Sequence, residues 1–483
     1  MKEEEESKSA FGMIGLGTMG SNLLLNIVDQ GYSCSGYDIS PQKVVTLNEL
    51  NPEAIHGFTD LKEFVMSLSS PRIVMMLVPA GAIVDSVIEE LLAVLDKGDI
   101  IIDGGNSHFI DTDRRFKYLE EKGYHFIGMG VSGGESGARN GPSMMPGGDK
   151  EAYEAIKPIL TKIAAKVNGE PTVAYMGERS AGHFVKMVHN GIEYALMQLI
   201  SETYEVLKHG LELSDEEIYE VYKTWNDGRL QSYLLEITRD IFAFKEEGAK
   251  HLLLNDIKDE AKAKGTGKWT SQAAMDLNLP IPIIDISVSM RDLSKYKDLR
   301  IKGAELYPNP KAEPYSDDNA KYIASMEEAF YFAMVSAYAQ GMHLLYRANE
   351  DFKYELDLGV IAKIWRGGCI IRSAFLEDIY AAYKKNPELE HLFLDEDIHQ
   401  SVINSIPGIR TFVSDVAKHG IAAPAFCVSL AYFDNFRNKE MPANLIQAQR
   451  DFFGSHTYEL KGKTGVFHTD WEEDPKVNTE ADS

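Results

Sequence analysis

The sequence is poor in the features that mark secreted, metal-binding and membrane proteins. Its 483 residues include only three cysteines, Cys34, Cys369 and Cys427, without CxxC or metal-ligand spacing. No uninterrupted apolar run approaches the ~18 residues that a membrane span requires. The first ten residues, MKEEEESKSA, are acidic and polar, unlike a secretory signal. These absences predict reduced cysteines and a cytoplasmic protein.

Basic residues are also too few for a protein that binds a polyanion. The chain has 49 Lys and Arg against 74 Asp and Glu, a formal net charge of −25. Such a charge repels phosphate backbones and anionic lipid, so we expect no nucleic-acid partner and no membrane-surface binding. If the ligand is an anionic small molecule, a local cluster of Lys and Arg must oppose the overall field.

The chain is too long for one core, and two patterns divide it. In residues 11–180, β-rich runs such as FGMI, RIVMML and DIIID alternate with helical patterns, which predicts a Rossmann-type α/β domain with a parallel sheet. Residues 181–438 show long helical periodicity and predict a large all-α domain. Residues 439–483 are expected to form a C-terminal tail.

The helical part contains a degenerate repeat. A WxxG motif at Trp225 precedes an SxxLE motif at Ser232, and the same pair of motifs recurs at Trp365 and Ser373. One such match is a weak signal, because WxxG is a common pattern. It nevertheless leads to the hypothesis that the all-α domain is internally duplicated.

The motif GLGTMG, residues 15–20, predicts a dinucleotide site. It follows the strand candidate FGMI and opens the helical pattern SNLLLNIVDQ. Gly15 would allow a tight turn, Gly17 would let the backbone approach a pyrophosphate, and Gly20 would permit close helix–strand packing. Asp38 ends the next strand candidate, which adds the acidic residue of a dinucleotide-binding unit.

Two further strand candidates end in polar, glycine-rich stretches. DGGNS, with Asn106, follows DIIID, and Ser132-Gly133-Gly134 opens the run SGGESGARNGPSMMPGG. Ligands of doubly wound sheets bind beyond the carboxyl ends of the strands. Asn106 could orient a hydroxyl or a carboxamide, and Ser132 with backbone N–H groups could hold a carboxylate. Each stretch taken singly is equally well an ordinary surface loop.

The stretch GHFVKMVHNGIEY, residues 182–194, predicts a helix with an unusual polar face. Lys186, His189, Asn190 and Glu193 share one side of it, and the other side is apolar. This combination indicates chemistry, although a face of interhelical salt bridges is the alternative. Other basic residues are less informative: KGTGKWT (residues 264–270) lacks the spacing of a phosphate-binding P-loop and could be a flexible loop.

Together these stretches resemble the decarboxylating 6-phosphogluconate dehydrogenases. The resemblance covers nearly the whole chain, residues 13–468, and is carried by GLGTMG, DGGNS, GVSGGESGARNGPSMMPGG, GHFVKMVHNGIEY, KGTGKWT, WRGGCIIRS and PANLIQAQRDFFGSHTYEL in the family's order. It implies oxidation of the carbon-3 hydroxyl of 6-phosphogluconate by a nicotinamide dinucleotide, loss of carbon dioxide, and protonation of the enediol to give ribulose 5-phosphate.

Two alternative functions fit the sequence less well. A related β-hydroxyacid dehydrogenase, such as one acting on 3-hydroxyisobutyrate, would be much shorter and would lack KGTGKWT and the tail. A catalytically dead dinucleotide sensor would be favoured by the loss of Lys186 or Glu193, and both are present.

The resemblance implies a role for each site residue. Lys186 matches the general base and Glu193 the general acid, so we expect a lowered pKa for the lysine and a raised pKa for the glutamate. Arg450 and His456 match residues that reach the partner's site, which implies a homodimer with shared active sites. The resemblance also implies that no metal ion takes part. The expected substrate contacts are Asn106, Ser132, Gly133, Gly134, His189, Asn190, Tyr194, Lys264, Thr266, Arg291, Arg450 and His456.

The choice of cofactor is where the sequence departs from the family. Asp38-Ile39-Ser40 stands where NADP-dependent members commonly carry Asn-Arg-Thr, and Asp38 would repel a 2′-phosphate. Ser40 and Lys43 could still help to bind a phosphate, and Asp38 could instead cap the next helix. We predict a preference for NAD, with NADP as the alternative. The expected cofactor contacts are Gly15, Leu16, Gly17, Thr18, Met19, Gly20, Asp38, Ile39, Ser40, Val78, Pro79, Ala80 and Asn106.

Overall fold

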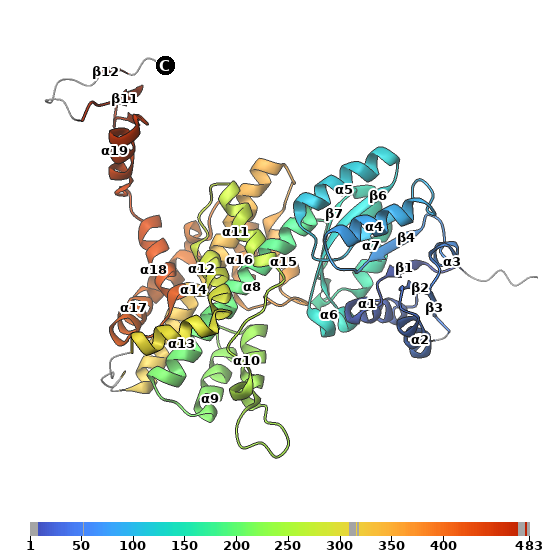
Figure 1. The fold of residues 1–483 in the computed structure, drawn as a ribbon, viewed down its shortest axis with the longest axis horizontal. Helices are drawn as coiled ribbons and strands as arrows, with labels where there is room; N and C mark the ends of the chain where they lie inside the picture. Colours follow the sequence, from blue (N-terminus) through green and yellow to red (C-terminus); the bar gives the residue numbers. More distant parts are fainter. Residues whose placement is uncertain (1–7, 52, 309–314, 316–317, 472–478, 481–483) are drawn as a thin grey trace, which may run out of the picture. The chain divides into compact units, whose positions relative to one another are not determined.

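The computed structural model describes residues 8–51, 53–308, 315, 318–471 and 479–480 (Figure 1). The chain divides into two compact units, residues 1–429 and 430–483, and each is described here by itself.

A seven-stranded sheet forms the first part of the larger unit. Its strand order is β3-β2-β1-β4-β5-β6-β7. Strands β1 to β6 are parallel, and β7 is antiparallel to β6. The direction of winding reverses between β1 and β4, which is where such sheets bind ligands. The strands are β1 (Phe11–Ile14), β2 (Cys34–Tyr37), β3 (Ile55–Phe58), β4 (Ile73–Met76), β5 (Ile100–Asp103), β6 (His125–Ser132) and β7 (Ser143–Gly148).

Helices cover both faces of this sheet. Apolar side chains of α1, α2 and α7 pack on one face, and those of α3, α4 and α5 on the other. Strand β5 is therefore buried throughout: its three isoleucines lie in the core, and Asp103 at its end is buried as well. The helices are α1 (Thr18–Asp29), α2 (Pro41–Leu50), α3 (Leu61–Met66), α4 (Ala82–Leu92), α5 (Phe109–Lys122), α6 (Gly134–Asn140) and α7 (Lys150–Ile163).

The glycine-rich run after β6 is not the surface loop that its composition allowed. It contains the short helix α6 and then β7, whose six residues are all buried. The strand SMMPGG shows no polar–apolar alternation, because it is covered on both faces and pairs with β6 along its whole length. Strand β3 was also absent from the strand candidates.

The rest of the larger unit is helical apart from a small hairpin, β8 (Lys166–Val167) and β9 (Glu170–Pro171), that precedes it. Within the described ranges, no helix is long and apolar enough to cross a membrane. The predicted fold class, a Rossmann-type domain followed by a large all-α part, is confirmed. The helices are α8 (Ala181–Glu205), α9 (Asp215–Asn226), α10 (Tyr233–Ala243), α11 (Thr266–Asp276), α12 (Pro282–Ser294), α13 (Lys297–Leu306), α14 (Asn319–Phe352), α15 (Leu358–Trp365), α16 (Phe375–Lys385) and α17 (Glu396–His419), with a short π-helix, η1 (Val206–Gly210), and two 3-10 helices, η2 (Leu253–Asp256) and η3 (Leu392–Leu394). Helix α18 (Pro424–Phe436) begins in the larger unit and ends in the smaller one.

Two helix triplets support the hypothesis of an internal duplication. Both α8-α9-α10 and α14-α15-α16 begin with a long helix, continue with a helix that ends at or near a buried tryptophan (Trp225 or Trp365), and close with a third helix that is shorter than the first. The repeated serines, Ser232 and Ser373, form an antiparallel bridge. The corresponding segments of the two triplets therefore face each other.

The smaller unit, which contains the predicted C-terminal tail (residues 439–483), folds around one buried carboxylate. It contains α19 (Ala443–Gly454), β10 (Tyr458–Glu459), β11 (Val466–His468) and β12 (Thr479–Glu480). Asp451 is fully buried and accepts hydrogen bonds from Thr457 N–H, His468 Nδ1, Thr469 N–H and Trp471 Nε1. The tail thus has an ordered centre of its own.

Candidate active site

Helix α8 places its polar face in the interior. Lys186, His189 and Asn190 are 6%, 0% and 7% exposed, as deeply buried as the apolar residues opposite them. The sheet can approach this closely because its strands carry glycine. A Cβ atom at Gly130 on β6 would overlap the Lys186 stem, and one at Gly182 would overlap the backbone of β6 and β7.

The polar side chains of α8 form one connected cluster with the end of β6. His189 Nδ1 lies 3.3 Å from Lys186 Nζ and 3.1 Å from Asn190 Oδ1. Glu193 Oε2 is 3.9 Å from the same nitrogen. On the other side of the ring, His189 Nε2 lies 3.1 Å from Ser132 Oγ. The histidine therefore links the two candidate catalytic groups to the candidate carboxylate-binding loop.

Burial shifts the protonation of this cluster in the directions expected for catalysis. It lowers the pKa of Lys186, against the opposing attraction of the Glu193 charge. It raises the pKa of Glu193, although Lys186 pulls that pKa down. The pKa of His189 lies well below its usual value because the ring is buried and faces Lys186. A neutral amine and a protonated carboxyl on one helix face can act as base and acid.

The candidate phosphate end lies one residue further along α8. Tyr194 is buried, and the Arg291 guanidinium of α12 stacks 3.6 Å from its ring centroid. Thr266 begins α11, whose Gly267 packs so closely on the Tyr194 ring that a Cβ would lie 2.6 Å from it. Lys264 is exposed just before this helix N-terminus. An arginine on the tyrosine ring, and a helix start preceded by a lysine, suit an anion.

The loop after β6 is held in a conformation that requires glycine. Gly133 has φ of +121°, and a Cβ there would lie 2.6 Å from the carbonyl oxygen of Gly368. Gly134 follows in the left-handed region, at φ +62°, and is exposed at the start of α6. Backbone N–H groups can therefore approach a ligand here without side chains in the way.

The GLGTMG turn has the geometry predicted for its three glycines. Gly15 has φ of +93°, a value that favours glycine. A Cβ at Gly17 would meet nothing within 4 Å, so the turn is open on the ligand side. A Cβ at Gly20 would overlap the Gly15 carbonyl oxygen. Thr18 and Met19 begin α1, whose N-terminus can face a pyrophosphate.

Asp38 is fixed at the end of β2 as a buried carboxylate. It accepts hydrogen bonds from Leu16 N–H at 2.8 Å, Ser40 N–H at 2.9 Å and Lys43 Nζ at 2.9 Å. Burial raises its pKa, but these three donors more than offset that effect and hold the pKa below the usual value. The Ile39 side chain beside it is 85% exposed. Asp38 is thus an ionised acceptor next to the glycine turn.

The loops after β4 and β5 stand on the same edge of the sheet. Val78 is half-buried, and Pro79 and Ala80 are exposed beyond β4. Asn106 is exposed beyond β5. Two residues further, the ring of His108 packs on that of Trp269 in α11, with centroids 4.9 Å apart. The cofactor edge and the candidate phosphate helix are therefore in contact.

Several residues of the site were not predicted from the sequence. Gly130 leaves space for the Lys186 stem. The Trp365 ring packs edge-on against the His189 ring, with the ring centroids 5.6 Å apart. Cys369 is fully buried near Lys186, and burial raises its thiol pKa to about 12 although the Lys186 charge opposes this shift. Alternating glycines in HFIGMGVS were the one local signal for a closely packed helix.

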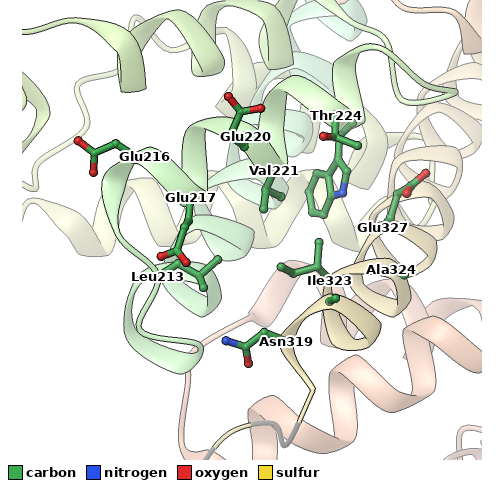
Figure 2. Close-up of a pocket in the computed structure, with 12 residues that line it drawn as sticks. Leu213, Glu216, Glu217, Glu220, Val221, Thr224, Asn319, Ile323, Ala324 and Glu327 are labelled. Carbon is green, nitrogen blue, oxygen red and sulfur yellow. The ribbon is translucent and has the colours of Figure 1, made fainter.

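A separate hollow in the helical part does not suit the substrate. It has a volume of about 650 Å³ and lies between α9 and α14, with an apolar floor that includes Trp225 and Ile323. Figure 2 shows the carboxylates of Glu216, Glu217 and Glu327 around it. None of the predicted site residues is among the described residues that line it. Its acidic rim would repel an anionic sugar.

Two of the expected substrate residues, Arg450 and His456, belong to the tail unit. Arg450 lies on α19, and His456 follows it between Ser455 and Thr457, both at positive φ. In the part of the chain that is described, no group of three or more His, Cys, Asp or Glu side chains is arranged to hold a metal ion.

A glycine turn at the switch point of a parallel sheet, together with a helix face that carries a buried lysine and a largely covered glutamate, defines a nicotinamide dinucleotide-dependent dehydrogenase. The family models agree: residues 10–177 match the NAD binding domain of 6-phosphogluconate dehydrogenase, and residues 182–471 match its C-terminal domain. The chain belongs to the family of decarboxylating 6-phosphogluconate dehydrogenases.

Individual relatives extend this similarity to the whole length. The chain is 49% identical, over 96% of its length and 99% of the relative's, to the NADP(+)-dependent, decarboxylating 6-phosphogluconate dehydrogenase of Bacillus subtilis. It is 48% identical, with the same coverage, to the decarboxylating enzyme of Escherichia coli. A solved relative is the 6-phosphogluconate dehydrogenase of Plasmodium falciparum, studied with NADP+ and with 6-phosphogluconate. The match includes 96% of this chain and 100% of the Plasmodium chain, with 43% identity and a TM-score of 0.93.

Proposed function

We propose that this protein oxidises and decarboxylates 6-phosphogluconate to ribulose 5-phosphate, with Lys186 as base and Glu193 as acid. The observation that carries the assignment is the buried face of α8, where burial favours a neutral lysine and a protonated glutamate. Lys186 takes the proton of the carbon-3 hydroxyl as hydride leaves for the nicotinamide. The 3-keto acid then loses carbon dioxide, and Glu193 protonates carbon 1 of the enediol.

The other side chains bind and orient the substrate. Ser132 and the N–H groups of Gly133 and Gly134 receive its carboxylate, with Asn106 next to the cofactor. The positive charges of Arg291 and Lys264 attract the substrate's phosphate, and the start of α11 at Thr266 adds backbone N–H donors. These cations provide the local positive charge that a chain of net charge −25 needs for an anionic substrate.

Replacing the two catalytic groups tests this assignment. Lys186→Met should lower kcat by about 10²–10⁴-fold, because base catalysis is lost, and should leave cofactor binding intact. Glu193→Gln should slow the protonation step and release a keto or enediol intermediate. Lys223→Met, at an exposed lysine of α9, is the control for loss of charge. Near-native turnover in both active-site variants would contradict the proposed roles.

We propose NAD as the preferred cofactor, in contrast to the NADP named for the Bacillus subtilis relative and for the Plasmodium falciparum structure. Asp38 supports this, because its ionised carboxylate would repel a 2′-phosphate, and exposed Ile39 offers no cation to bind one. Lys43 pairs with Asp38 and reduces that repulsion. The test is to measure kcat/KM with each dinucleotide; a higher value with NADP would overturn the preference. Asp38→Asn with Ile39→Arg should shift the ratio toward NADP.

We also propose a homodimer in which each tail completes the partner's site. The tail exposes several large apolar side chains, among them Leu445, Ile446 and Phe453, which are 60% to 72% exposed and call for a covering surface. Mixing Arg450→Ala chains with Lys186→Met chains should restore activity, since one site of a mixed dimer carries neither defect. If subunit exchange is verified and activity does not return, the result argues against shared sites.

The free cysteines support a reducing, cytoplasmic compartment.

A further inference from the structure

Arg115 is a buried cation that the proposed chemistry does not use. It lies on α5, and its side chain is 1% exposed beneath the loops that follow β4 and β5. Its Nε donates to Asp85 Oδ1 at 2.8 Å, and its Nη2 donates to the Gly81 carbonyl oxygen at 3.0 Å. Its Nη1 reaches Asp103 Oδ2 at 3.5 Å and Ser107 Oγ at 3.4 Å. One guanidinium therefore contacts both loops.

The two loops are built on the groups that Arg115 holds. Asp103 ends β5 and accepts hydrogen bonds from Gly105 N–H at 3.1 Å and Ser107 Oγ at 2.6 Å, which shapes the turn carrying Asn106. Gly81 and Asp85 begin α4, directly after the stretch 78–80 at the end of β4. Asn106 and residues 78–80 are among the cofactor contacts that the sequence predicts.

Only a planar, forked cation can serve these acceptors together. The guanidinium donates in several fixed directions, whereas a lysine ammonium is a single point charge. Asp103 is itself 1% exposed, so the ion pair is buried, and loss of the cation would leave an unpaired carboxylate inside the protein. Because its nitrogens contact separate groups of the two loops, the guanidinium fixes the spacing of the loops as well as compensating charge.

We propose that Arg115 is a positioning residue for the dinucleotide: it sets the loop after β4 and the loop after β5 at the spacing that the cofactor needs. The proposal rests on the proposed function for the identity of the reaction. Asn106 then faces the nicotinamide from a loop that cannot shift independently of the loop after β4. Because a displacement of about 1 Å can cost on the order of 10²-fold in rate, a looser pair of loops should weaken cofactor use strongly.

Adjacent arginines provide a matched test. Arg114 binds the same Asp85, at 2.9 and 3.0 Å, but its side chain is 56% exposed and also faces Asp111 on its own helix. Arg115→Lys keeps the charge and loses the fork, so it should raise the cofactor KM and dissociation constant about tenfold or more. The KM for 6-phosphogluconate at saturating cofactor should change less than twofold. Arg114→Lys should leave both constants at wild-type values.

A purely structural role predicts a different result. It would lower the melting temperature and the amount of active protein, but the folded fraction would keep a wild-type cofactor KM. If Arg115→Lys does not fold, Ser107→Ala is the substitute test. It removes one hydrogen bond to Asp103 and one to Arg115 without leaving a charge unpaired. The KM and dissociation constant of the cofactor should then shift in the same direction. Wild-type cofactor constants in a folded Arg115→Lys or, failing that, Ser107→Ala protein would overturn the proposal.

The two proposals fail in distinguishable ways. Cofactor binding is followed by the fluorescence of the reduced dinucleotide, which requires no turnover. A wild-type protein that binds the dinucleotide but does not convert 6-phosphogluconate would refute the proposed reaction and leave the Arg115 measurement intact. An active wild type with unaltered dinucleotide binding in the folded variants would refute the Arg115 role alone.

Discussion

Glu202, a buried carboxyl on α8, should make the stability of the protein depend on pH. Its side chain accepts hydrogen bonds from the backbone N–H groups of Ala425 at 2.9 Å and Phe426 at 3.2 Å, at the start of α18, and from Gln198 Nε2 at 2.9 Å. Burial raises its pKa from 4.5 to about 7, although these donors favour the charged form. The folded protein thus holds a proton that the unfolded chain releases at lower pH.

The sign of the effect follows from proton linkage. Between pH 4.5 and about 7 the folded state binds more protons at Glu202 than the unfolded state, so this group's contribution to the free energy of unfolding falls as the pH rises. A shift of this size corresponds to about 3 kcal/mol across the window. Below the window the contribution does not change, and above it the loss is complete. The thiol of Cys427, which faces Glu202, has a raised pKa and titrates above this range.

Urea unfolding of the wild type and of Glu202→Gln at pH 5 and pH 8 measures this contribution. Other groups titrate in both proteins, so the difference between the two pH dependences isolates Glu202. The wild type should lose about 3 kcal/mol more than the variant between pH 5 and pH 8. Glu205→Gln, at a less buried position of the same helix, is the control. Equal pH dependences for the wild type and Glu202→Gln would show that Glu202 is not held protonated.

Three further predictions concern the site, the tail and metal dependence. Gly130→Ala should destabilise the protein by about 1–3 kcal/mol and lower kcat, because the new methyl group displaces the Lys186 stem. Thermal unfolding and initial rates measure these effects, and unchanged values of both would contradict the packing. Asp451→Asn places an amide NH2 against hydrogen-bond donors in the tail and should cost about 1–3 kcal/mol, measured as faster proteolysis after residue 430. Treatment with EDTA should leave the initial rate unchanged, and a loss restored by added metal would refute a metal-free mechanism.

Short-range sequence patterns predicted much of the fold. The strands at FGMI, RIVMML and DIIID were found because central parallel strands contain runs of apolar residues. Strand β7 was missed because glycines and a proline in SMMPGG usually indicate a loop, and its partner β6 supplies the pairing from outside the segment. Antiparallel addition at a sheet edge leaves no local pattern in the sequence.

The candidate site divides in the same way. The face of Lys186, His189 and Glu193 follows from helical spacing, so the sequence alone predicted that these groups meet. The contacts of Ser132 with His189, and of Trp365 with the same ring, join segments far apart in the chain. No spacing rule reports such contacts, because they depend on how the helices are packed against the sheet.

The close packing of α8 on the sheet restricts how the molecule can open. The first turn of this helix lies against the backbone of β6 and β7 at Gly182, and Lys186 rests on Gly130 one turn later. A hinge at this joint would have to break main-chain packing that glycine alone permits. The Lys186 stem therefore cannot move away from β6 without breaking this packing.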